Sequence, residues 1–171
     1  MLDRKMLAAL NDQVNAELYS AYLYLAMSAH FESMGLPGFA SWMKVQAQEE
    51  MVHAMKFFNF ILDRGGKADL AAIEKPKGTW KSASEMFGDA LAHEEYITKR
   101  IHDLVALAAK VNDKATESFL QWYVDEQVEE EKSATDMLQK TKMVEKAPGA
   151  LYFVDREAAT RVFTMPAGVT I

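Results

Sequence analysis

Cysteine is absent from this sequence, so disulfides, thiolate metal sites and thiol nucleophiles are excluded as bases for its fold or chemistry. Glycine and proline are scarce, with eight and four copies in 171 residues, which leaves long stretches without helix breakers. Basic residues are outnumbered by acidic ones, 19 to 25, and the net charge of −6 argues against a nucleic-acid partner and for attraction of cations. No apolar run is long enough for a signal peptide or a membrane span, so we expect a soluble, cytoplasmic protein without a membrane partner.

The stretches between the glycines and prolines predict an all-α protein. Ser82 and Glu85 fit a capping box at the start of one helix, and Asn112 and Asp113 can cap the next. Hydrophobic residues make up 50% of the chain, enough for one core, so we interpret residues 1–171 as a single domain. Four long helices are expected at about 4–33, 38–64, 83–110 and 113–143, a short fifth helix at about 149–163, and a tail at 164–171.

The lengths of the connections predict the topology. Only a few residues join the first helix to the second and the third to the fourth, so each pair should form an antiparallel hairpin. The link from Gly65 to Lys81 is longer, since about 15 extended residues reach about 50 Å, more than the roughly 40 Å of a helix of about 27 residues. This length suits a crossover along a four-helix bundle, which makes the second and third helices parallel. A flexible surface loop is the alternative, although Leu70, Ile73 and Trp80 offer side chains for packing.

Each long helix has a stripe of inward positions that steps by fours and threes, as in a helical bundle. Polar side chains of the kinds that bind metals interrupt every stripe at positions that should be apolar. The stripes comprise Leu10, Val14, Glu17, Ala21, Tyr24 and Ser28; Met43, Ala47, Glu50, Ala54, Phe57 and Ile61; Phe87, Leu91, Glu94, Thr98, Ile101 and Val105; and Leu120, Tyr123, Gln127, Glu130, Ala134 and Met137.

The interruptions repeat between the two hairpins. Glu50 follows Glu17 by 33 residues, and Gln127 follows Glu94 by the same 33. Three positions later, on the same helical face, the second helix of each hairpin adds another potential ligand, which is His53 in one and Glu130 in the other. Pairing the two hairpins would therefore bring six polar side chains to one level of the core.

Electrostatics favours a metal centre at this level. One such glutamate alone is more often a boundary residue that reaches water, and one inward histidine is usually hydrogen-bonded packing. Four carboxylates in an apolar core cannot all ionise without counter-charge, and the stripes contain no Lys or Arg. Two divalent cations would supply that charge, with His53 as a neutral donor. Oxygen donors with one imidazole and no sulfur suit iron or manganese rather than structural zinc, without deciding between those two.

Three segments around these positions resemble the non-haem ferritins of bacteria and archaea: NAELYSAYLY at 15–24, QEEMVH at 48–53 and QWYVDEQVEE at 121–130. The resemblance covers nearly the whole chain and implies an iron-storage ferroxidase that uses oxygen or peroxide. It implies a homo-oligomeric shell, expected to be a 24-mer. It also implies a di-iron centre in which Glu17 and His53 bind the first iron, Glu50 bridges, Glu94 and Glu130 bind the second, and Gln127 is a polar neighbour.

The same resemblance implies two further features. Glu49, Glu126 and Glu129 match a third iron site that shares Glu130, whereas the residues alone are equally consistent with a solvated acidic turn. Tyr24 matches a tyrosine beside the centre that donates an electron during oxygen reduction. Taken alone, Tyr24 is more typical of a core aromatic with a hydrogen-bonded hydroxyl.

Related families differ at visible positions. A bacterioferritin would have a second Glu-x-x-His where Gln127 and Glu130 stand, and Met51, which is placed like the haem-ligating methionine of that family, also occurs in non-haem relatives, so haem is not expected. A rubrerythrin would need cysteines, and Dps-type shells usually lack a fifth helix. His30, His93 and His102 have no partner at ligand spacing and are interpreted as surface or boundary residues.

Two other functions stay open on the sequence alone. One is a non-catalytic assembly subunit whose buried acids bind a structural divalent ion. The other is a di-iron oxidase or peroxidase that does not store iron. The role of the fifth helix is open as well, because it could dock on its own bundle or line a symmetry-axis contact in the shell.

Overall fold

The structure is a computed structural model that describes residues 2–166, so the predicted tail at 164–171 lies partly outside the described residues. The expected all-α architecture is confirmed, since the described residues form helices without strands. None of these helices is both long and apolar enough to cross a lipid bilayer. The helices are α1 (Arg4–Ser33), α2 (Pro37–Asp63), α3 (Ala83–Lys110), α4 (Lys114–Val144) and α5 (Pro148–Ala158).

Short side-chain caps explain where the helices begin. The Ser82 hydroxyl accepts a hydrogen bond from the backbone N–H of Glu85 at 3.1 Å, and the Glu85 carboxylate accepts one from the N–H of Lys81 at 2.7 Å. Asp113 caps α4 by accepting from the N–H of Thr116 at 3.1 Å. These contacts satisfy backbone donors that have no partner within the first turn of a helix.

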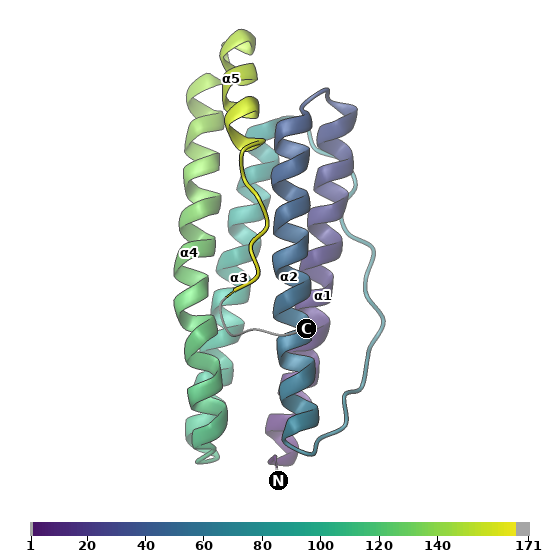
Figure 1. Ribbon diagram of the computed structural model, residues 1–171, viewed down its shortest axis with the longest axis vertical. Coiled ribbons are helices and arrows are strands. Elements are labelled where there is room, and N and C mark those ends of the chain that lie inside the picture. Colours follow the sequence, from purple (N-terminus) through teal and green to yellow (C-terminus); the bar gives the residue numbers. More distant parts are fainter. Residues whose placement is uncertain (1, 167–171) are drawn as a thin grey trace.

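The long link between α2 and α3 runs along the bundle beside α1, so α2 and α3 point in the same direction as predicted (Figure 1). Of the three apolar side chains expected to anchor it, only Trp80 is buried, while Leu70 and Ile73 are exposed. Hydrogen bonds from α1 fix the rest of the link. The Asn11 amide donates to the Lys67 carbonyl at 3.1 Å, and the Asn15 amide donates to the Ala72 carbonyl at 3.2 Å.

The apolar core consists of two clusters of buried side chains, with the polar level between them. One cluster includes Met27, Phe39 and Phe87, and the other includes Leu10 and Phe57. The predicted stripes of α1, α2 and α4 are buried throughout.

The predicted stripe of α3 was partly wrong. Leu91, Thr98 and Val105 are only half-buried, and the buried positions lie one residue earlier, at Ala90, Ile97 and Leu104. Phe87, Glu94 and Ile101 belong to both the predicted and the observed face, so the error lies in the order of the three- and four-residue steps between them, which helical periodicity alone leaves open.

The fifth helix docks on its own bundle, against α2 and α4, and ends at Ala158 rather than near residue 163. The β-branched Thr160, Val162 and Thr164, which disfavour helix, follow its end. Its buried Asp155 accepts a hydrogen bond from the N–H of Phe39 at 2.8 Å. This contact supplies the cap that α2 lacks, because its own N-cap residue, Leu36, has no capping side chain.

Gly38 is required where α5 crosses the start of α2. A Cβ atom added at Gly38 would collide with the backbone carbonyl of Asp155, which cannot move without displacing α5. We predict that Gly38→Ala lowers the free energy of unfolding by roughly 1–3 kcal/mol and exposes α5 to proteases. Chemical unfolding and limited proteolysis measure both effects. Gly149→Ala is the matched control, because a Cβ atom there meets nothing within 4 Å, and equal behaviour of the two variants would contradict the prediction.

Candidate metal centre

Four helices contribute to one polar level of the core. α1 contributes Glu17, α2 contributes Glu50 and His53, α3 contributes Glu94, and α4 contributes Gln127 and Glu130. Each of these six side chains is at most 5% exposed, a degree of burial that charged residues reach only when paired or bound to a metal. The two hairpins therefore bring together the six positions that the repeated spacing singled out.

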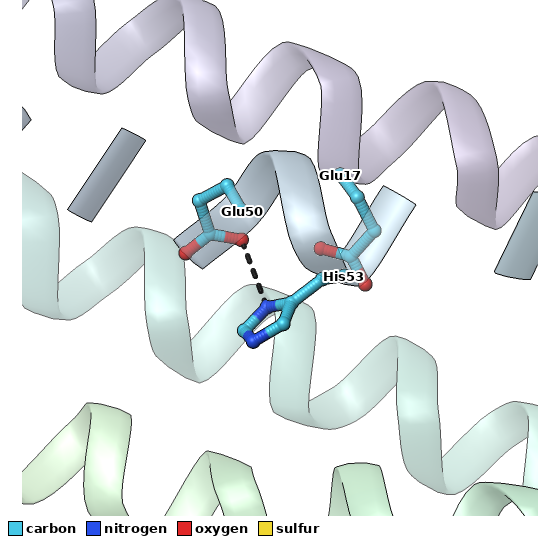
Figure 2. Close-up of side chains that lie close together, drawn as sticks. All are labelled: Glu17, Glu50 and His53. Atoms are coloured by element: carbon cyan, nitrogen blue, oxygen red, sulfur yellow. Dashed lines mark hydrogen bonds and ion pairs between the residues drawn. The ribbon is translucent and has the colours of Figure 1, made fainter. Parts of the chain in front are cut away.

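The potential ligand atoms form overlapping groups, in each of which the atoms lie within 4.8 Å of one another. Glu17, Glu50 and His53 make one group, and its side chains point toward one another from α1 and α2 (Figure 2). Glu50 also belongs to a second group with Glu94 and Glu130. Glu50 therefore lies where a carboxylate could contact two adjacent metal ions at once, one in each three-residue group.

Hydrogen bonds hold these side chains in place. His53 Nδ1 lies 3.3 Å from a carboxylate oxygen of Glu50 (Figure 2). The Gln127 amide donates to the Glu94 carboxylate at 3.2 Å, and the Tyr24 hydroxyl donates to the other oxygen of Glu94. Tyr24 is thus in direct contact with one of the clustered carboxylates.

The carboxyl groups hold protons unusually tightly. Burial, assisted by the charge of Glu50, raises the pKa of Glu17 to about 7, although His53, Gln13 and Arg100 act in the opposite direction. Burial and the neighbouring glutamates raise the pKa values of Glu94 and Glu130 to about 8. The pKa of Glu50 is raised well above its ordinary value, first by burial and then by the charge of Glu130. Burial and the repulsion between the carboxylates therefore outweigh the positive charge of the nearby side chains.

The donor set fits a divalent cation. Glu17 Oε2 is buried and has no hydrogen-bond partner among the described residues, so this oxygen is free to accept a bond. Such an orphaned acceptor is costly unless it binds something that the protein itself does not provide. Carboxylate oxygens with one imidazole nitrogen are ligands that iron and manganese accept.

The residues assigned to a third site are only partly brought together. Glu126 forms a group with His53 and Glu130, and one of its oxygens lies 3.9 Å from His53 Nε2. Glu49 and Glu129 belong to none of these groups. Glu129 is exposed, and Glu49 is ion-paired with Arg161.

Two arginine–glutamine pairs, Arg100–Gln13 and Arg161–Gln46, support the cluster, and the sequence did not predict either of them. The Gln13 amide donates to Glu17 at 2.8 Å, and its oxygen accepts from Arg100 Nε at 2.9 Å. Because a guanidinium can only donate, Arg100 fixes the amide orientation of Gln13. A readable signal existed, since Gln13 precedes Glu17 by four residues, just as Gln46 precedes Glu50 on α2.

The Arg100–Gln13 pair should support metal binding at Glu17. In Arg100→Ala the Gln13 amide loses its fixed orientation, and the positive charge that lowers the pKa of Glu17 is gone. We predict that the affinity for the first divalent cation falls roughly tenfold at pH 7, as is usual when a ligand loses its supporting contact. Anaerobic calorimetry with Fe(II) measures this affinity. The control is Lys99→Ala, which removes the exposed charge that precedes Arg100 in sequence. Equal affinities in both variants would contradict the idea that Arg100 supports metal binding through Gln13.

The other histidines lie where the sequence interpretation put them. His30 and His93 are half-buried, and His102 is exposed. His93 lies 2.8 Å from the Ser20 hydroxyl, and burial lowers its pKa to about 4. His30 Nε2 lies 2.9 Å from the backbone carbonyl of Trp80 and helps to fix the crossover.

Comparison with known proteins gives consistent matches over the chain. A family model described as "Ferritin-like domain" matches residues 7–144. The "Bacterial non-heme ferritin" of Staphylococcus aureus (strain MRSA252) is 39% identical over 163 residues, which is 95% of this chain and 98% of the relative. Its namesake from Staphylococcus haemolyticus is 40% identical with the same coverage. Among solved structures, an open-pore ferritin from Archaeoglobus fulgidus is 50% identical, with a TM-score of 0.94 over 95% of this chain and 99% of that chain.

Proposed function

The chain belongs to the ferritin family, and from this premise we infer that it is an iron-storage ferroxidase. It oxidises Fe(II) to Fe(III) with oxygen and keeps the ferric product inside an oligomeric shell. The observation that carries this function is the buried cluster of four carboxylates and one imidazole, which combines raised pKa values with an unsatisfied oxygen. A bundle that needed only stability would place apolar side chains at these positions.

We propose that the cluster is a di-iron centre. In this proposal Glu17 and His53 bind one Fe(II), Glu94 and Glu130 bind the other, and Glu50 bridges them, with Gln127 orienting Glu94 through its amide. The overlap of the two three-residue groups at Glu50 supports this assignment. Glu49, Glu126 and Glu129 would serve a third, weaker position that shares Glu130.

The chain's own groups supply positioning, charge and protons. Two adjacent Fe(II) ions can each give one electron to a single acceptor molecule, either oxygen or peroxide, which takes up both. The buried carboxyls hold protons in the metal-free protein, and cation binding must displace these protons. We propose that Tyr24 provides a further electron, a role that the family resemblance implies, and its hydroxyl contact with Glu94 supports this proposal.

The assembly is proposed to be a 24-mer shell in the cytoplasm. Exposed apolar side chains on the single chain support this proposal, because contacts between subunits would cover them. They include Tyr22 and Leu25 on α1 and Phe153 on α5. Sizing of the native particle tests this proposal, because a monomer or dimer could not enclose a mineral. Iron loading of the same particle tests storage: uptake far above two Fe per subunit supports it, whereas saturation near two would leave an oxidase without storage.

A further inference from the structure

Arg161 connects the C-terminal segment to the carboxylate cluster. It lies just beyond α5, in the extended segment that passes between α2 and α4 (Figure 1). Its guanidinium carbon sits 4.3 Å from the centre of the Trp42 ring, a cation–π contact that fixes the side chain against α2. The side chain is only 21% exposed, so its charge is partly shielded from water.

The guanidinium contacts two residues next to the proposed ligands. Nη1 donates to the Gln46 oxygen at 2.8 Å, and Nη2 donates to the Glu49 carboxylate. The Gln46 amide in turn donates to Glu50 at 3.1 Å and to Glu130 at 2.7 Å. One planar group therefore fixes Gln46 and also neutralises Glu49.

Glu49 is one of the carboxylates proposed for the third metal position, and in the structure it is ion-paired with Arg161 instead. The neighbouring group of His53, Glu126 and Glu130 is assembled without Glu49. A cation that used Glu49 together with this group would have to displace the guanidinium and approach its positive charge at close range. Neither cost applies to the two central positions, whose ligands contact no arginine directly.

We propose that Arg161 is a tethered cation that competes with a third metal ion for Glu49 and thereby keeps that ion weakly bound. The inference rests on the proposed di-iron centre, since the third position shares Glu130 with it. Its consequence is an order of occupancy: the two central positions fill first, and the third fills only when Arg161 is displaced. The C-terminal segment would thus control how readily iron occupies the position beside the centre.

Anaerobic calorimetry with Fe(II) on the assembled shell tests the proposal, with Zn²⁺ as a redox-inert repeat. In Arg161→Gln the third binding step should tighten by up to about fivefold relative to the first two. Arg161→Lys, which keeps the charge, should retain a weak third step. Arg156→Gln on α5 is the control for loss of a cation near the same segment, and it should behave like the unmodified protein.

A double variant separates competition from indirect effects. Glu49→Gln combined with Arg161→Gln should lose the tightened third step, because the contested carboxylate is gone. An unchanged or weaker third step in Arg161→Gln overturns the proposal, as does tightening that persists in the double variant. Absence of the first two steps in the unmodified protein would instead contradict the di-iron centre itself, so the two failures are distinguishable.

Discussion

Glu50→Gln should abolish rapid iron oxidation and at the same time stabilise the metal-free protein. The substitution preserves the shape of the side chain but removes the carboxylate shared by both three-residue groups. Loss of a supporting contact typically costs ten- to a hundredfold in metal affinity or activity, so loss of the shared ligand should lower the initial oxidation rate at least about 100-fold. Stability should rise because burial raises the pKa of Glu50 well above its ordinary value, so folding at neutral pH must protonate this carboxyl, a cost that the neutral amide of Gln does not have.

The formation of Fe(III) after aerobic addition of Fe(II), followed by absorbance, measures the rate. Urea unfolding of the metal-free protein measures the stability. Glu95→Gln is the matched control, because Glu95 adjoins Glu94 in sequence but is exposed. Oxidation by Glu50→Gln at the rate of this control would mean that the reaction occurs elsewhere, and a large loss of stability would mean that Glu50 has a structural role.

The metal-free protein should lose stability between pH 7 and 9, and bound metal should prevent this loss. Glu17, Glu94 and Glu130 have pKa values of about 7, 8 and 8 in the folded chain, against an ordinary value of 4.5. In this window the folded state therefore holds more protons than the unfolded state. The free energy of unfolding of the metal-free protein must then fall as pH rises through 8, by an amount on the order of a few kcal/mol in total.

Metal binding should remove this slope, because a cation takes the place of the protons and the folded chain then holds no more of them than the unfolded chain. Affinity for divalent cations should increase from pH 7 to 9, and binding at pH 7 should release protons, detectable by calorimetry in buffers of different ionisation enthalpy. The window starts at pH 7 because His93, whose pKa is lowered to about 4, contributes a slope of opposite sign below its ordinary value of 6.5. Parallel pH slopes with and without metal would contradict this linkage.

Periodicity and spacing were sufficient to predict the long helices, the crossover and the six clustered side chains. These features depend on local rules: the helical repeat places Glu50 and His53 on one face, and the equal offsets align the hairpins. The same local rules left one choice open on α3. From Phe87, a step of three and a step of four both stay on the inward helical face, and the prediction took Leu91 where Ala90 is the buried residue.

The surroundings of the cluster were less predictable than its ligands. Arg100 and Arg161 reach the cluster through Gln13 and Gln46, and these contacts span 87 and 115 residues of sequence. No helical pattern encodes contacts that depend on how separate elements pack. The early end of α5 at Ala158 is different, because the β-branched Thr160 and Val162 that follow it can be read from the sequence.

In the proposed di-iron centre, carboxylates from both hairpins bind two cations side by side in the core. The most direct measurement is anomalous X-ray scattering at the iron absorption edge from crystals soaked anaerobically in Fe(II). We expect two strong peaks per subunit, one beside Glu17 and His53 and the other beside Glu94 and Glu130, with Glu50 between them. Peaks confined to the protein surface, with the core side chains still bonded only to one another, would contradict it.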